Sequence, residues 1–276
     1  MNIKRIDYIV NIVTDEYIKA KTESKEWKQL VRRSLKYERG MKQVLRSYFI
    51  AQERKTMNAL TKFRKAVSFP FLEKEFINSQ KDELSDIIYP LIKRIVNNEG
   101  TISMEALQSR VTELIGDFKL DDDVLASIQS MVRTAASEVT ETTFKRLLIQ
   151  YDTGLELGET ISEIKQRMTT VFQDAVKNRV DTIARTEVMR ASNESRLLAY
   201  EQSGVVNKVR WYTAVDERRC NFCASLHNKA VKIGKEFSKD IKAPPAHVGC
   251  RCVLLPEVDP QYLKSWVAVY KNRKRT

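Results

Sequence analysis

The placement of cysteine constrains the fold of this 276-residue chain more than any other feature. All four cysteines lie in one C-terminal stretch and form two pairs, Cys220-x-x-Cys223 and Cys250-Arg-Cys252. His247, one of only two histidines, lies three residues before Cys250. Two ligand pairs separated by a loop are typical of a tetrahedral zinc site, because each tight turn brings two ligand atoms towards one ion.

Five side chains compete for the four positions of such a site. If the backbone of residues 250–252 is extended, the two cysteines point to opposite sides, so we expect only one of them to bind. His227 lies in the middle of the intervening loop, and we expect it to be exposed. Four protein ligands leave no open position, which indicates a structural rather than a catalytic zinc. We predict that the ligands are Cys220, Cys223, His247 and Cys250, with Cys252 as the alternative ligand.

Two other states of the cysteines stay open, namely a disulfide and reduced thiols in a small core. Acidic residues interrupt the N-terminal segment, which lacks the apolar core of a signal peptide. We therefore expect synthesis in the cytoplasm, where thiols stay reduced and a stable disulfide is disfavoured. No stretch approaches the roughly 20 consecutive apolar residues of a membrane span, so we expect no membrane segment.

The motifs around these cysteines resemble those of a known family. In chain order they are Arg185-Thr186-Glu187, Trp211, Asp216, Cys220-x-x-Cys223-x-x-Leu226 and Pro244-Pro245-x-His247-x-x-Cys250-Arg251-Cys252. Over roughly residues 150–256 this order resembles the head morphogenesis family typified by the phage Mu F protein. One difference follows Leu226, where the family commonly carries a polar residue and a glycine. Here Asn228 replaces the glycine, and asparagine tolerates the left-handed conformation.

The resemblance implies a minor head protein, that is, a virion protein of a tailed bacteriophage. Such a protein is made in the bacterial host cytoplasm and lies inside the capsid near the portal. The implied partners are the phage portal protein and the major capsid or scaffolding protein, and the implied roles are capsid assembly, DNA packaging and DNA ejection. The resemblance says little about residues 1–150.

Positive charge is concentrated at the N-terminal end of the chain. The formal net charge is +12, and residues 1–70 contain 17 Lys and Arg against 7 Asp and Glu, a net charge of +10. One expected helix carries four basic residues close together, Arg32, Arg33, Lys36 and Arg39. These residues form either a solvated basic face or a binding surface. The partner of such a surface would be an acidic protein ring or double-stranded DNA, whose phosphates lysine and arginine contact without sequence preference.

Glycine and proline are scarce before residue 150, which favours long helices. The periodicity predicts helices over residues 3–20, 25–40, 41–67 and 71–97, and Pro90 starts or kinks the last of these helices. A turn is expected at residues 97–100. It is followed by an apolar helical stripe over residues 104–115 and by a helix after the acidic residues 121–123. Residues 151–158 are the expected domain junction. Thr160 and Glu163 then match a capping box that opens a helix with Ile161 on its inner side.

A second helix is expected over about residues 175–203, with Gly204 ending it. Its polar face carries Glu187, Arg190 and Glu194, and we interpret this face as a charge network that anchors the helix on the segment with the predicted zinc site. Short strands near residues 209–213, 231–233 and 252–255 predict a small antiparallel sheet, held by the metal rather than by a large core of its own. Pro256 is expected to break the chain before a helix over 262–270 and a basic tail.

The predicted fold class is α+β and predominantly helical. The predicted domains are a basic helical domain (1–150), a Mu F-like α+β domain stapled by zinc (151–258), and a C-terminal helix with a basic tail (259–276).

We expect no enzyme, because no nucleophile or carboxylate cluster completes a catalytic mechanism. One alternative is a zinc-containing nuclease, which needs an open metal position and a nearby base; Asp216, Glu217 and His227 are the close candidates. The other is a zinc-containing nucleic-acid-binding protein. It would need a basic helix beside the metal, whereas residues 175–203 carry mixed charge.

Overall fold

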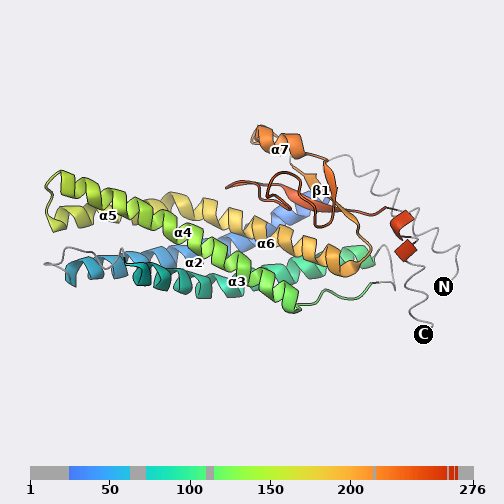
Figure 1. The fold of residues 1–276 in the computed structure, drawn as a ribbon, viewed down its shortest axis with the longest axis horizontal. Helices are drawn as coiled ribbons and strands as arrows, with labels where there is room; N and C mark the ends of the chain where they lie inside the picture. Colours follow the sequence, from blue (N-terminus) through green and yellow to red (C-terminus); the bar gives the residue numbers. More distant parts are fainter. Residues whose placement is uncertain are drawn as a thin grey trace. The chain divides into compact units, whose positions relative to one another are not determined.

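The computed structural model describes residues 25–62, 73–109, 115–213, 216–259, 261–263 and 265–266 (Figure 1). Its elements are α2 (Lys25–Lys62), α3 (Lys74–Gln108), α4 (Asp122–Glu156), α5 (Ile161–Asp174), the π-helical turn η2 (Ala175–Arg179), α6 (Val180–Ser203), β1 (Lys208–Tyr212), α7 (Asn221–Leu226), β2 (Ala230–Lys232) and β3 (Val253–Glu257). The predicted mostly helical α+β class with a small antiparallel sheet is confirmed. The predicted helix 3–20, the break at 68–70 and most of the segment 262–276 lie outside the described residues.

The chain divides into two compact units built from interleaved segments. One unit takes its residues from Met1–Leu35, Arg94–Leu125 and Val188–Thr276, and the other from Lys36–Lys93 and Ala126–Glu187. The predicted domains 1–150, 151–258 and 259–276 stay a prediction.

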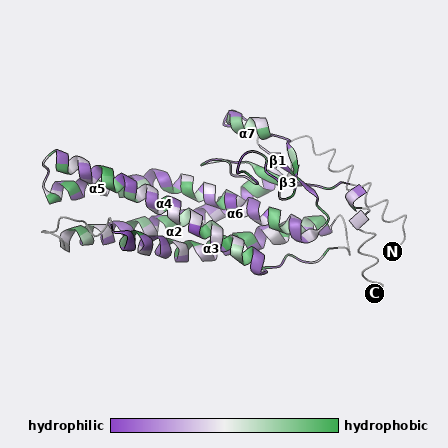
Figure 2. Cartoon of the chain, viewed as in Figure 1, coloured by the Kyte–Doolittle hydropathy of each residue, from purple (hydrophilic) through white to green (hydrophobic). Residues whose placement is uncertain are grey.

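The second unit is helical, and α4 and α5 share its core. That core comprises Leu60, Phe144, Leu147, Tyr151, Ile164, Met168, Val171 and Phe172. The predicted capping box opens α5: the Thr160 hydroxyl accepts a hydrogen bond from the Glu163 N–H (3.3 Å), and the Glu163 carboxylate accepts one from the Thr160 N–H (2.7 Å). Ile161, expected on the inner side, is instead 40% exposed. Figure 2 shows how hydrophobic and hydrophilic residues alternate along these helices.

Gly40 does not end a helix, so the predicted boundary between residues 40 and 41 is wrong. The helix α2 runs through this glycine without interruption. Helix-favouring residues and buried side chains on both sides, including Glu38 and Met41, outweigh the roughly 1 kcal/mol by which a single glycine disfavours helix.

The predicted turn at residues 97–100 is also wrong, because α3 continues through it to Gln108. Two contacts within the first unit account for this. Glu99 is fully buried and accepts two 2.7 Å hydrogen bonds from the guanidinium of Arg33, which satisfies its charge inside the helix bundle. Gly100 lies against the ring of Phe118, so the glycine serves close packing rather than a turn: a Cβ at this position would lie 2.3 Å from the ring.

The first unit contains the sheet, whose order is β2-β1-β3 with both pairs antiparallel. Pro256, expected to break the chain, lies within β3 opposite Val209. This is an edge strand, where a proline can be accommodated because one side of the strand needs no ladder partner.

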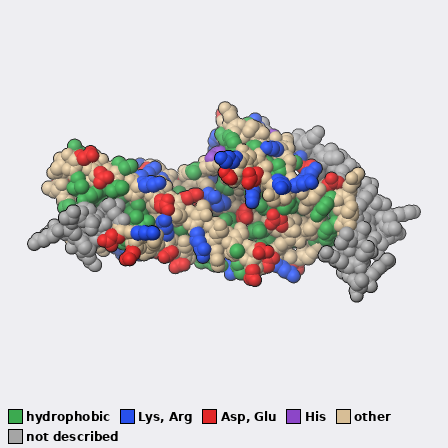
Figure 3. Space-filling view, in the orientation of Figure 1, with side chains coloured by type: hydrophobic (Ala, Val, Ile, Leu, Met, Phe, Trp, Pro, Cys, Tyr) green, Lys and Arg blue, Asp and Glu red, His purple; other side chains and the backbone are tan. Residues whose placement is uncertain are grey.

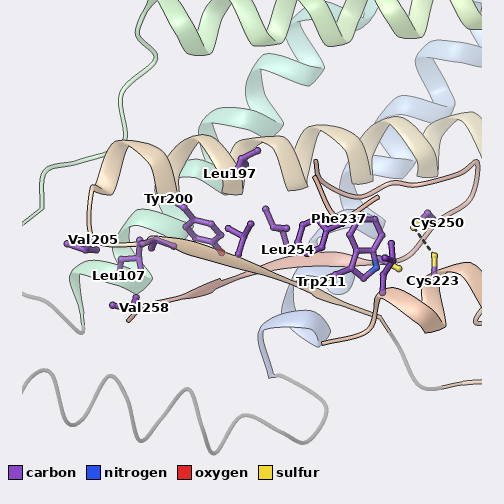
Figure 4. Packing of buried hydrophobic residues seen from close by; sticks show 14 of the residues in the cluster. Leu107, Leu197, Tyr200, Val205, Trp211, Cys223, Phe237, Cys250, Leu254 and Val258 are labelled. Carbon is purple, nitrogen blue, oxygen red and sulfur yellow. Dashed lines mark hydrogen bonds between the residues drawn. The ribbon is translucent and has the colours of Figure 1, made fainter. Parts of the chain in front are cut away.

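A substantial core lies between the sheet and α6, which corrects the expectation of a sheet held mainly by metal. Trp211 is fully buried and packs edge-to-face on Phe237 at 5.3 Å between ring centroids. Figure 4 shows Leu197 and Tyr200 of α6 in the same cluster as Leu254 and Trp211, with Cys223 and Cys250 at the end next to Trp211.

Two glycine-to-alanine substitutions should change stability in opposite directions. At Gly40 a new Cβ meets only Leu91 at 3.5 Å, an ordinary contact, so Gly40→Ala should stabilise the protein by about 0.5–1 kcal/mol through the lower chain entropy of alanine. Gly100→Ala should destabilise it by about 1–2 kcal/mol, because the Phe118 ring must move. Urea unfolding measures both, and equal stabilisation by the two substitutions would contradict the close packing at Gly100.

Candidate metal centre

The first pair of ligand residues is delivered by the turn that precedes α7. Cys220 is the N-cap of this helix, and its sulfur accepts a hydrogen bond from the backbone N–H of Cys223 (3.3 Å). Cys220 is exposed, whereas Cys223 is 3% exposed and belongs to the core beneath the sheet. The Cys-x-x-Cys spacing therefore places one sulfur at the surface and one at the edge of the core, both on the same side of the turn.

The second pair is delivered by a tight turn over residues 247–250. The backbone N–H of Cys250 donates to the carbonyl oxygen of His247 (3.1 Å), and Gly249 has a φ of +75°. A side chain would be strained at that φ, which explains the glycine between the histidine and the cysteine. His247 is exposed and Cys250 is buried, so this turn also presents one ligand on each side of the surface.

The two turns meet at their ligand atoms. His247 Nε2 lies 3.3 Å from Cys220 Sγ and 3.2 Å from Cys223 Sγ. Cys223 Sγ lies 3.8 Å from Cys250 Sγ, and Figure 4 shows these two side chains facing each other. With zinc–sulfur bonds of about 2.3 Å, two thiolates of a tetrahedral site lie about 3.8 Å apart. The Cys223–Cys250 separation therefore matches one edge of such a tetrahedron, and Cys223 is the ligand residue that links Cys220 and His247 on one side to Cys250 on the other.

Cys252 also lies in this cluster. The ligand atoms of Cys220, Cys223 and His247 form one group within 4.8 Å of one another, and those of Cys223, Cys250 and Cys252 form a second. The expectation that Cys250 and Cys252 point apart assumed an extended backbone, whereas β3 begins only at Val253. Both sulfurs therefore reach Cys223, and Cys252 keeps its place as the alternative ligand.

The thiols perturb one another strongly. A hydrogen bond from the Cys252 side chain, partly opposed by burial, lowers the pKa of Cys250 to about 5. The same contact, together with burial, raises the pKa of Cys252 far above its usual value. Burial and the charge of Cys250 raise the pKa of Cys223 to about 12. The cluster by itself thus favours few negative charges, and a bound cation would stabilise more of them.

His247 has a raised pKa for a related reason. Burial lowers it, but the hydrogen bond with the Val248 carbonyl and the charges of Cys250 and Cys220 outweigh that effect. The Nδ1 atom lies 2.9 Å from the Val248 carbonyl oxygen, an arrangement that directs Nε2 towards the sulfurs. A backbone partner on the second ring nitrogen is common for histidines that bind metals.

His227, the other histidine, lies outside both groups, although it is partly buried rather than exposed. Its Nδ1 accepts a hydrogen bond from the Thr213 N–H (3.2 Å), and its ring packs on Tyr212 at 5.1 Å between centroids. Burial and the charges of Arg219 and Arg210 lower its pKa. Asn228 beside it has a φ of +64°, which confirms the expected left-handed conformation.

All four cysteines are free. The Cys223–Cys250 sulfur separation of 3.8 Å is well beyond the roughly 2.05 Å of a disulfide bond. The structure therefore presents the cluster as thiol and imidazole ligands.

Asn193 of α6 is a structural residue of this region to which the sequence analysis gave no role. It is fully buried, its amide nitrogen donates to the carbonyls of Met189 (2.9 Å) and Cys252 (3.1 Å), and its amide oxygen accepts from the Leu254 N–H (2.8 Å). One signal was available: Asn193 stands four residues from both Met189 and Leu197, so a polar residue occupies an apolar helix face. The charge network of Glu187, Arg190 and Glu194 stays an interpretation.

The fold and the cluster together define a helical protein with a small α+β region that could hold one metal ion. Residues 145–255 match the family described as "Phage Mu protein F like protein". The predicted resemblance is confirmed: this segment is phage Mu F-like, and it contains all five candidate ligands. No curated protein and no solved structure matches the chain.

Within the residues that the structure describes, no helix is both long enough and apolar enough to span a membrane.

Proposed function

We propose that this chain is a minor head protein of a tailed bacteriophage, with one structural zinc ion bound by its Cys/His cluster. It would reside in the virion near the portal and take part in capsid assembly, DNA packaging or DNA ejection. The observation that carries the proposal is that the Mu F-like segment, residues 145–255, includes the whole cluster.

The residues of the cluster fit zinc in number, type and arrangement. Thiolate and imidazole groups are the ligands that structural zinc prefers, and two turns that each supply two ligands are the usual arrangement. The bound zinc would supply a cross-link between these turns. The protein residues would hold it in a closed site, because Cys223 and Cys250 lie at the edge of the core while Cys220 and His247 cover the outer side.

We also propose that the protein is not an enzyme. A zinc nuclease needs a free acid–base group beside the metal. Of the candidates, Asp216 forms two hydrogen bonds with Arg251, and the Nδ1 of His227 accepts the Thr213 N–H. These contacts favour a structural role for both side chains.

Zinc content and its dependence on single cysteines test the metal site. The purified protein should contain about one zinc per chain by mass spectrometry of the metal. Cys223→Ser should lose most of it, since this sulfur contacts both His247 and Cys250. Cys252→Ser should retain the ion, because Cys250 is the predicted ligand of this pair. Zinc lost from Cys252→Ser but retained by Cys250→Ser would make Cys252 the ligand, and metal-free wild-type protein would contradict the proposed site.

Association with the head tests the virion assignment. We expect the protein to co-sediment with procapsids that contain the phage portal protein, and to bind the isolated portal more tightly than the major capsid or scaffolding protein. Procapsids that lack the portal are the control, and their binding should be weak. Absence from both particles would contradict a portal-associated role.

Non-specific contact with double-stranded DNA is the second part of the proposed role. Arg32, Lys36 and Arg39 are exposed on α2, whereas Arg33 is engaged by Glu99. On the face drawn in Figure 3, basic and acidic side chains are interspersed, so any phosphate contact on that face is local. The three exposed residues of α2 are therefore the ones to test.

Replacing Arg32, Lys36 and Arg39 together by glutamine should weaken DNA binding and reduce its salt dependence. Each lost phosphate contact makes the negative slope of log K against log salt shallower by about 0.9, so three lost contacts should reduce its magnitude by about 3. The control replaces three exposed basic residues of α3 and α4, namely Arg94, Arg133 and Lys145. An equal loss in both variants would indicate a net-charge effect and not a contact surface on α2.

A zinc-containing nucleic-acid-binding protein or a nuclease is the alternative. It would bind a preferred sequence or cleave DNA in a zinc-dependent way without any affinity for the portal. The same salt titration, repeated with two unrelated DNA sequences and followed by gel analysis of the DNA, distinguishes the alternative from the head-protein role.

A further inference from the structure

We infer that Asp216 and Arg251 are positioning residues that hold the two ligand-bearing turns together, so that the metal site stays assembled. The inference rests on the metal-binding role proposed above and adds two residues that do not bind the ion themselves.

The contact between the two side chains is a two-pronged ion pair. Arg251 Nη1 donates to Asp216 Oδ2 at 2.8 Å, and Arg251 Nη2 donates to Asp216 Oδ1 at 2.6 Å. The planar guanidinium and the planar carboxylate therefore meet edge to edge, which fixes both distance and orientation. The pairing with Arg251 also holds the pKa of the Asp216 carboxyl below its usual range.

Each partner belongs to a different turn of the cluster. Asp216 lies four residues before Cys220, and its Oδ1 also accepts the backbone N–H of Arg218 (3.1 Å), while its carbonyl accepts the N–H of Arg219 (3.1 Å). Asp216 thus shapes the bend that leads into Cys220. Arg251 stands between Cys250 and Cys252, so the ion pair bridges the two turns directly.

Arg251 is also held from its backbone side. Its carbonyl oxygen accepts a hydrogen bond from the indole Nε1 of Trp27 (3.2 Å), at the start of α2. Trp27 packs against a buried cluster of this unit that contains Leu30, Met189, Tyr212, Val253 and Leu255. The turn that contains Arg251 is therefore held against the buried cluster through Trp27. The ion pair with Asp216 then connects the turn before Cys220 to the turn that contains Arg251.

The expected effect is on metal affinity rather than on overall stability. The two side chains are 36% and 25% exposed, and exposed ion pairs contribute little to folding. A zinc ion, however, needs both turns at once, so a tie between them reduces the ordering cost of binding. Residues that orient metal ligands typically change metal affinity 10–100-fold when they are replaced.

Zinc affinity and the rate of zinc release, measured by competition with a chromogenic chelator, test the inference on the full chain. Asp216→Asn and Arg251→Gln should each weaken binding about 10–100-fold and accelerate release. The double variant should bind about as weakly as either single variant, because both changes remove the same contact. Arg251→Lys, which keeps the charge but not the two-pronged geometry, should show an intermediate loss.

The matched control is the ion pair of Lys81 and Glu141 (2.7 Å), which joins α3 to α4 within the second unit and includes no candidate ligand. Glu141→Gln should leave zinc affinity unchanged. The thermal midpoint of the zinc-free protein should be the same for wild type and Asp216→Asn. If the ion pair had a purely structural role, Asp216→Asn would lower this midpoint.

The outcomes separate the inference from the proposed function. Wild-type protein that binds no zinc overturns both. Zinc binding by the wild type with unchanged affinity in Asp216→Asn overturns the inference alone. So do losses that add up in the double variant, or a loss matched by a lower thermal midpoint of the zinc-free protein.

Discussion

Three sulfurs and one imidazole meet across two turns, in contacts of 3.2–3.8 Å, at the edge of the core of the first unit. Burial and the charge of Cys250 both oppose ionisation of Cys223 and raise its pKa to about 12, whereas the hydrogen bond from Cys252 lowers the pKa of Cys250 to about 5. A divalent cation at their centre would turn that opposition into a cross-link. Because one turn follows β1 and the other precedes β3, such a cross-link would also join two paired strands.

The sheet is attached to the helices by a second set of contacts that needs no metal. Asn193 satisfies backbone groups of Cys252 and Leu254, which are buried and would otherwise lose hydrogen bonds. Trp211 fills the space between the sheet and the segment around Phe237. The Cys/His cluster therefore lies at the edge of an existing core. A metal ion bound there would cross-link two surface turns and would not replace core packing.

Local signals in the sequence predicted the parts of the fold that local chemistry decides. The capping box of Thr160 and Glu163, the end of α6 at Gly204 and the left-handed Asn228 depend on the residues at those positions. The meeting of the Cys-x-x-Cys and Cys-Arg-Cys segments was predictable because metal-type ligands rarely cluster by composition alone.

The features that the sequence did not reveal depend on residues distant in the chain. Glycine and asparagine at residues 97–100 indicate a turn locally, yet the ion pair of Arg33 with the buried Glu99 and the ring of Phe118 over Gly100 favour a continuous helix. Pro256 is compatible with a strand only because β3 lies at the edge of the sheet. Both cysteines of the Cys-Arg-Cys segment reach the cluster because the strand begins after them.

Zinc-edge X-ray absorption of the purified protein tests the central claim most directly, because it reports the atoms bound to the ion. The account predicts a four-coordinate zinc with three sulfurs at about 2.3 Å and one imidazole nitrogen at about 2.0 Å. A shell dominated by oxygen, or a protein that carries no zinc after expression in zinc-supplemented medium, would contradict it.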